Sequence, residues 1–147
     1  MRFVAAILLV LMGACSKEAP MPLDIAQNKQ MIWDTIKAYH DAADKSDLDS
    51  IKPLLTPDVS MVMTSDDAIR GQEAVLRALR DRFKSYKGTP STITGKELIK
   101  PDGNSALVTY VASTTLQRGI ITVICSRNKD NKWLIAHIHE TWSAPPK

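Results

Sequence analysis

The spacing of apolar residues changes once along this chain, near Gly88, and this change limits the possible folds more than any other feature. Upstream of Gly88, helical spacing dominates. Residues 24–45 bring Ile32 and Ile36 to one face, and residues 72–86 form a second amphipathic segment. Downstream of Gly88, β-branched residues are frequent in residues 91–100, 105–117, 120–127 and 133–142, with turn residues between these segments. The sequence therefore predicts helices early in the domain and strands late in it.

Shorter elements lie between the two long helices. Residues 48–55 favour a short helix that Ser46 or Asp47 can cap, and residues 59–64 and a segment ending at Arg70 favour strands. The predicted order is α-α-β-β-α-β-β-β-β. This order indicates the α+β class, with a curved antiparallel sheet wrapped on the long N-terminal helix.

Composition excludes several classes of protein. With 147 residues, 44% of them hydrophobic and 24% charged, the chain has the make-up of one soluble globular domain. Its 19 basic and 16 acidic residues nearly balance, which argues against a nucleic-acid partner. Two cysteines are too few for a disulfide scaffold, and we expect Cys125, within an apolar segment, to be a buried and unreactive thiol.

The N-terminus has the pattern of a targeting signal. Arg2 is followed by an apolar run, Phe3–Met12, that is too short to span a bilayer but suits a signal peptide. The next residues, Gly13–Ala14–Cys15, resemble the lipobox of bacterial lipoproteins. That resemblance implies a signal peptide at 1–14, lipidation of Cys15, a tether at 15–23 and a folded domain at 24–147. The alternative is a plain secretory signal that is cut after Ala14 or nearby.

Lipidation would determine the location of the protein in the cell. Two or three acyl chains hold a protein stably on a membrane surface without crossing it. The resemblance therefore implies a protein of the bacterial cell envelope that is anchored to the membrane by its N-terminal lipid and faces the periplasm. Ser16, directly after the cysteine, favours the outer membrane.

Several short patterns occur along the domain in a consistent order. They are Tyr39 in the first helix, Asp47–Leu48 and then Asp58–Val59, Gly71–Gln72–Glu73–Ala74, and Trp133–Leu134–Ile135–Ala136–His137–Ile138–His139. Together they resemble the NTF2-like (SnoaL-like, cystatin-like cone) superfamily, and the last pattern looks like the association domain of calmodulin-dependent kinase II. Ser46 replaces the glycine usual in this family, and Ile124 replaces an arginine of that association domain's basic pocket.

The resemblance implies a cavity inside the cone, and the sequence offers candidates to line it. His137 and His139 lie two apart on a strand and therefore share a face. On a regular strand Trp133 and Ile135 share that face too, while Glu140 takes the other. By resemblance we expect the histidine face to line the cavity. The full set of candidate cavity residues is Tyr39, Trp33, Tyr110, His137 and His139.

Three chemical interpretations of the histidines remain open. They could bind a metal ion with His40, act as acid or base with Asp34 or Asp41, or pack at the mouth of a cavity. Packing is the interpretation we favour. We therefore expect no metal and no cofactor, and we assign no catalytic residue.

Three functional hypotheses follow. The first is a non-catalytic, lipid-anchored domain that holds a small apolar or amphipathic molecule and forms a homodimer or larger oligomer through its outer sheet face. The second is an enzyme of the SnoaL or ketosteroid isomerase kind, in which His137, His139 and Tyr39 act as acid, base or oxyanion donor. The third is a scaffold that docks a partner through Arg77 and Arg80 on the basic third helix.

Overall fold

The computed structural model describes residues 24–63, 67–85, 90–94 and 98–143. The expected signal peptide, Cys15 and the tether lie outside these ranges. Within them, no helix is long and apolar enough to cross a membrane.

Helices and strands follow the expected order with one strand more. The helices are α1 (Ile25–Asp44), α2 (Leu48–Ile51), the 3-10 helix η1 (Lys52–Leu54) and α3 (Gln72–Ser85). The strands are β1 (Leu55–Val62), β2 (Ile69–Arg70), β3 (Thr92–Ile93), β4 (Leu98–Asp102), β5 (Ser105–Ser113), β6 (Arg118–Arg127) and β7 (Trp133–Ser143). The extra strand arises because the single strand predicted at 91–100 is divided into β3 and β4, which pair with opposite ends of β5.

The sheet is mixed, not purely antiparallel as the sequence predicted. Its strands lie in the order β2-β1-β7-β6-β5-β3, with β4 also on β5. Every pair is antiparallel except β1 and β7, which run parallel. A meander explains the antiparallel pairs from β4 to β7. The parallel pair forms because the chain returns to the early strand β1 only at its end.

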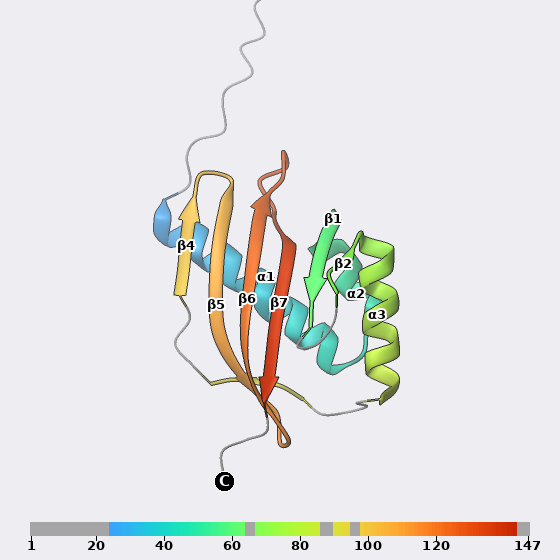
Figure 1. Ribbon diagram of the computed structural model, residues 1–147. Helices are drawn as coiled ribbons and strands as arrows, with labels where there is room; N and C mark the ends of the chain where they lie inside the picture. Colours follow the sequence, from blue (N-terminus) through green and yellow to red (C-terminus); the bar gives the residue numbers. More distant parts are fainter. Residues whose placement is uncertain (1–23, 64–66, 86–89, 95–97, 144–147) are drawn as a thin grey trace, which may run out of the picture.

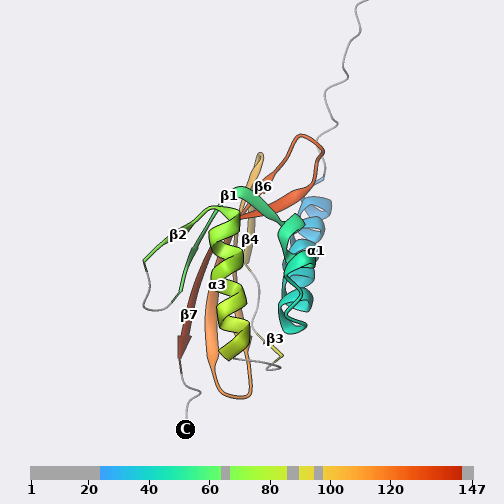
Figure 2. The ribbon, with the colours of Figure 1, turned by 90° about the vertical axis from the view of Figure 1, so that its right-hand side faces the viewer.

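Helix α1 crosses one face of the sheet, and α3 lies beside β1 and β2 (Figure 1). Viewed from the side, α1 stands on one side of the strands (Figure 2). Its apolar stripe, Ile32, Ile36 and Tyr39, is buried against the sheet, and Val75, Leu76 and Leu79 of α3 are buried as well. Burial of these side chains holds the two layers together. The α+β class predicted from the sequence is confirmed.

The segment after α1 turns sharply. Ser46 adopts a φ of 56°, in the left-handed region that favours glycine. Asp47 then caps α2, because its side chain accepts a hydrogen bond from the Ser50 N–H at 3.0 Å. Pro53 lies in η1, so the short helix ends in a 3-10 turn there. Of the two caps that the sequence allowed, the structure uses Asp47.

A β-bulge changes the alternation of side chains in β7. Ile124 of β6 faces His137 and Cys125 faces Ile135, so Ala136 is an extra residue in β7. The buried residues are therefore Trp133 and Ile135 before the bulge, but Ile138 and Glu140 after it. The prediction that Trp133 and Ile135 share a face with the histidines is wrong. The bulge turns His137 and His139 to the sheet face away from the helices.

This outer sheet face carries aligned rows of partly apolar side chains. One row runs Leu107, Ile124, His137 and Ser60 across β5, β6, β7 and β1. Ile120, which is paired with Val111 and Thr141 in another row, is 58% exposed. Leu107 and Ile124 are also exposed. The face is therefore an apolar surface that no described part of this chain covers.

Candidate functional site

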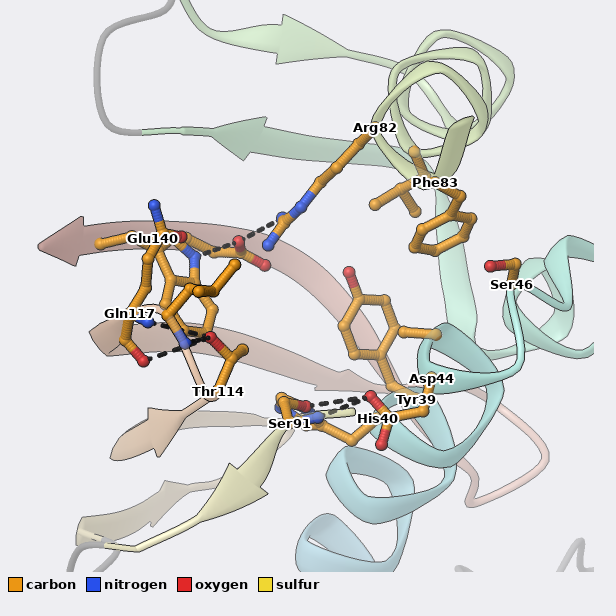
Figure 3. A pocket seen from close by; sticks show the side chains of 14 residues that line it. Tyr39, His40, Asp44, Ser46, Arg82, Phe83, Ser91, Thr114, Gln117 and Glu140 are labelled. Atoms are coloured by element: carbon orange, nitrogen blue, oxygen red, sulfur yellow. Dashed lines mark hydrogen bonds and ion pairs between the residues drawn. The ribbon is translucent and has the colours of Figure 1, made fainter. Parts of the chain in front are cut away.

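A cavity of about 140 Å³ lies between the C-terminal half of α1, α3 and the ends of β5, β6 and β7, and it is partly open to solvent. Figure 3 shows the side chains that line it. Its apolar walls are Ala43, Leu79, Phe83, Leu116 and Trp142. Its polar groups are Tyr39, His40, Asp44, Ser46, Arg82, Ser91, Thr114, Gln117 and Glu140. A largely apolar hollow with a few convergent polar groups is the usual form of a small-molecule site.

One wall is built around a buried ion pair. Glu140 is 4% exposed, and its Oε2 accepts hydrogen bonds from Arg82 Nη1 at 2.5 Å and from Trp142 Nε1 at 2.8 Å. The Arg82 guanidinium also lies 5.7 Å from the centroid of the Trp142 ring. Because a buried charge is stable only when it is paired, these contacts compensate the charge of Glu140.

A chain of hydrogen bonds forms the wall on the α1 side. The Ser91 hydroxyl donates to Asp44 Oδ1 at 3.2 Å, so it must accept from His40 Nδ1 at 2.9 Å. The other ring nitrogen, Nε2, is 2.7 Å from the Tyr110 hydroxyl and accepts its proton. These bonds assign the Nδ1–H tautomer to His40. The neutral form also agrees with burial, which lowers the pKa of His40 below its ordinary value.

This chain differs from a catalytic triad in the order of its members. In a triad the histidine lies between the serine and the carboxylate and takes the serine proton. Here Ser91 lies between His40 and Asp44, and His40 donates to Ser91. Both nitrogens of His40 are occupied. The arrangement therefore holds α1 to β3 and β5 and does not activate a nucleophile.

Tyr39 is a largely buried residue whose hydroxyl is accessible from the cavity. The residue is 5% exposed, and its hydroxyl points toward the Arg82–Glu140 pair (Figure 3). No residue in the described ranges makes a hydrogen bond to this hydroxyl. Burial, together with the negative charge of Glu140, raises the pKa of Tyr39. The side chain is therefore a neutral O–H donor aimed at a space that a ligand could fill.

The structure brings together only some of the residues that the sequence nominated. Tyr39 lines the cavity, and Tyr110 lies beneath it, bonded to His40. Trp33 is in edge contact with Tyr110 at a ring-centroid distance of 5.9 Å and lines a separate, more open hollow of about 340 Å³.

The two nominated histidines lie elsewhere. His137 is half-buried on the outer face and hydrogen-bonded through Nδ1 to Ser60 Oγ at 2.8 Å, and His139 is exposed. They do not line the cavity that Tyr39 faces. The physical reason is the bulge at Ala136, which no residue pattern in the sequence marks.

Sequence reasoning also missed residues that the cavity contains. Arg82 looked like one of several charges on a solvated helix, and Glu140 like a charge on the face away from the site. The one available signal was that Glu140 interrupts an otherwise apolar strand face, since a charge at such a position requires a partner. No group of three or more His, Cys, Asp or Glu side chains in the described part of the chain could hold a metal ion.

Comparisons with known proteins identify the family of the chain and structures with a similar fold. A family model described as a SnoaL-like domain matches residues 32–145. Among solved structures, an uncharacterised protein with a cystatin-like fold from Caulobacter vibrioides has a TM-score of 0.73 and 17% identity, covering 81% of this chain and 92% of that chain. An NTF2-like superfamily protein from Salmonella enterica has a TM-score of 0.71 and 20% identity, covering 84% of this chain and 95% of that chain.

A third similar structure has a suggested activity. A candidate ketosteroid isomerase from Shewanella frigidimarina has a TM-score of 0.63 and 19% identity, covering 77% of this chain and 94% of that chain. At such identities the likeness shows the fold alone. Among curated proteins, no sequence matches this chain.

Proposed function

We propose that this chain, which belongs to the SnoaL-like domain family, binds a small and partly apolar molecule in the cavity without converting it. The observation that carries the proposal is the cavity of about 140 Å³ with the Tyr39 hydroxyl accessible in its wall and without a hydrogen bond from a described residue. Once water is displaced from the cavity this hydroxyl needs a hydrogen-bond partner, because an unpaired polar group away from water costs about 1–3 kcal/mol. A bound molecule would supply that partner.

A binding role is favoured because the cavity's polar groups are mostly bonded to one another. Both nitrogens of His40 are engaged, and Ser91 donates to Asp44. Arg82 and Trp142 both bind Oε2 of Glu140. Groups held in this way give a site its shape and its polarity, whereas a general acid or base must be free to exchange a proton with the substrate.

Native mass spectrometry of the full chain in detergent tests the binding role. We expect a reproducible small-molecule adduct, which Ala43→Leu removes because the added atoms fill the cavity. The matched control is Ala68→Leu, the same change at an exposed position that lines neither hollow, and it should keep the adduct. An adduct that survives Ala43→Leu, or a wild-type chain without any adduct, would contradict the proposal.

The second candidate is an acid–base enzyme of the ketosteroid isomerase kind. One observation favours it: a tyrosine and a glutamate that are both largely buried residues, Tyr39 and Glu140, line the same cavity. Incubating the protein with the molecule released from it separates the two functions. Recovery of the unchanged molecule supports binding, and its conversion to a product that Tyr39→Phe abolishes supports the enzyme.

We also propose that the outer sheet face joins two copies of this chain. Leu107, Ile120 and Ile124 are exposed on aligned rows of that face, and such an apolar patch is unfavourable in water. A two-fold contact would cover it on both copies. In sedimentation measurements we expect a dimer that Ile120→Lys converts to a monomer. Ile25→Lys, at a 66% exposed position on α1, should leave the dimer intact.

A further inference from the structure

Two polar groups in the cavity wall, both accessible from the cavity, keep hydrogen-bonding capacity unused within the described part of the chain. One is the hydroxyl of Tyr39. The other is the carboxylate of Glu140. Both of its donors, Arg82 Nη1 and Trp142 Nε1, bind the same oxygen, Oε2. The second oxygen, Oε1, accepts no hydrogen bond from a described residue. The cavity therefore presents a donor and an acceptor together.

The two groups have complementary chemical character. Tyr39 is a donor, because burial raises the pKa of its phenol and keeps the proton on the oxygen. A carboxylate oxygen of Glu140 paired with Arg82 is an acceptor. Figure 3 shows the Tyr39 hydroxyl directed toward the Arg82–Glu140 pair, so both groups face the same part of the cavity. A hydroxyl group on a ligand can accept one hydrogen bond and donate another, and it would satisfy both.

The charges of the lining favour an uncharged ligand. Arg82 is already paired with Glu140. The further ionic group is Asp44, which is negative and accepts hydrogen bonds from the backbone N–H and the hydroxyl of Ser91. An anionic ligand would therefore meet a net negative lining and a cation that is already compensated.

The volume limits the size of the ligand. An apolar protein cavity of about 150 Å³ binds benzene, and this cavity measures about 140 Å³. Phe83, Leu79 and Trp142 supply flat and aliphatic walls for such a molecule. A single six-membered ring fits these dimensions.

We infer that the cavity takes a neutral hydroxyl compound the size of one six-membered ring, a phenol or a cyclic alcohol. Its oxygen accepts a hydrogen bond from Tyr39, and its hydrogen is donated to Oε1 of Glu140. This inference rests on the proposed ligand-binding function and adds the chemistry of the ligand to it. A site built to hydrogen-bond a hydroxyl discriminates against an analogue of the same shape that lacks one.

Three ring-sized probes test the inference on the full chain in detergent micelles. Phenol, toluene and benzoate share a ring but carry a hydroxyl, a methyl and a carboxylate. Equilibrium dialysis against protein-free micelles corrects each isotherm for partition into detergent. We expect phenol to bind about tenfold more tightly than toluene, the ratio that one good hydrogen-bonded site supplies, and benzoate to bind least.

A pair of tyrosine variants identifies the group responsible. Tyr39→Phe removes one of the two hydrogen-bonding groups and leaves Glu140, so we expect the preference for phenol over toluene to become clearly smaller while part of it remains. Tyr110→Phe removes another tyrosine hydroxyl, which is bonded to His40 outside the cavity, and it should keep the preference. A preference of unchanged size in Tyr39→Phe overturns the inference. The comparison of phenol with toluene on the wild-type chain stands even if a variant fails to fold.

The outcomes separate this inference from the function on which it rests. If none of the three probes binds, the ligand-binding function fails together with the inference. If toluene binds as tightly as phenol, or benzoate binds most tightly, the cavity binds ligands and the preference for a neutral hydroxyl is wrong.

Discussion

His40 uses both of its ring nitrogens inside the protein, and this makes it a support for the cavity. It joins Tyr110 on β5 to Ser91 just before β3, and Ser91 in turn bonds Asp44 at the end of α1. Three segments that are distant in the sequence are therefore fixed by hydrogen bonds between small groups. Such a buried network is stabilising only while every member stays bonded.

Acid should weaken this support. Burial lowers the pKa of His40, so below about pH 6.5 the unfolded chain binds more protons at this residue than the folded chain. The contribution to stability is complete above that pH and decreases as the pH falls. We expect the urea midpoint to decrease between pH 7 and pH 5, and less steeply in His40→Gln. His137→Gln, at a half-buried histidine whose pKa is also lowered, should reduce the slope less. An unchanged slope in His40→Gln would contradict this account.

Ser46 carries backbone strain that glycine would relieve. Its φ of 56° costs a residue with a side chain about 1–2 kcal/mol, whereas glycine adopts this angle freely. The greater freedom of glycine in the unfolded chain offsets about 0.4–1 kcal/mol of that gain. Ser46→Gly should therefore raise the free energy of unfolding by up to about 1 kcal/mol, measured by urea denaturation. Asn131→Gly, at a φ of 60°, should gain less, because asparagine tolerates this region. A loss of stability in Ser46→Gly would show that the backbone at Ser46 is not strained.

Among the elements, β7 determines which residues form the site. Its alternating pattern correctly predicted a strand and correctly put Glu140 on the face away from the two histidines. Because of the bulge at Ala136, the face that carries Glu140 points toward the core, and the face that carries the two histidines points outward. A bulge depends on pairing with a neighbouring strand. It leaves no fixed trace in the alternation of a strand whose two faces are both largely apolar.

The helices were predictable to within a residue or two, since their signals are local. Amphipathic spacing located α1 and α3, and the side chain of Asp47 marked the start of α2. Strand ends were less predictable. Arg118 and Gly119 have the composition of a turn, yet they begin β6, because Thr114 accepts hydrogen bonds from the N–H groups of Leu116 and Gln117 and so forms the turn earlier.

The Trp142 side chain packs tightly against the backbone of β6 at Gly119. Its register partner is Trp142, and a Cβ added to Gly119 would lie 2.7 Å from the indole ring. Gly119→Ala should therefore destabilise the fold by about 1–3 kcal/mol, the usual range for overpacking, and should disturb the Trp142 bond to Glu140 in the cavity wall. Chemical denaturation measures the first effect and tryptophan fluorescence the second.

A double-mutant cycle provides the control for Gly119. If the indole is the obstacle, Gly119→Ala should be less harmful in a Trp142→Leu background. Equal destabilisation in both backgrounds would show that the added methyl group acts elsewhere.

For the whole molecule, the family and the α+β fold could be predicted from sequence, because several weak patterns occur in the right order along the domain. The family model over residues 32–145 confirms that prediction. The similarity to the kinase association domain and the lipidated N-terminus remain predictions. The cavity lining was not predictable to the same degree, since Arg82 and Glu140 are brought together only by the packing of α3 on the sheet.

The proposed lipid anchor gives a prediction at this scale. We expect the chain, expressed in a Gram-negative bacterium, to remain with the membrane fraction after a high-salt wash. Cys15→Ser should release it, because the variant lacks the thiol that would carry the acyl chains. Cys125→Ser is the matched control: this cysteine is buried in β6, and its loss should leave the protein in the membrane fraction. Release by both variants, or by neither, would refute an anchor at Cys15.

The parallel pair of β1 and β7 has a consequence for folding during synthesis. Ser60 and His137, joined across this pair, are separated by 77 positions in the sequence. Strand β7, the last of the described strands along the chain, therefore occupies an interior place in the sheet, between β1 and β6. A nascent chain that has already formed α1 still lacks β7, against which α1 packs, so folding of the domain waits until β7 has left the ribosome. A chain truncated before β7 should therefore stay unfolded and be bound by chaperones or degraded by proteases.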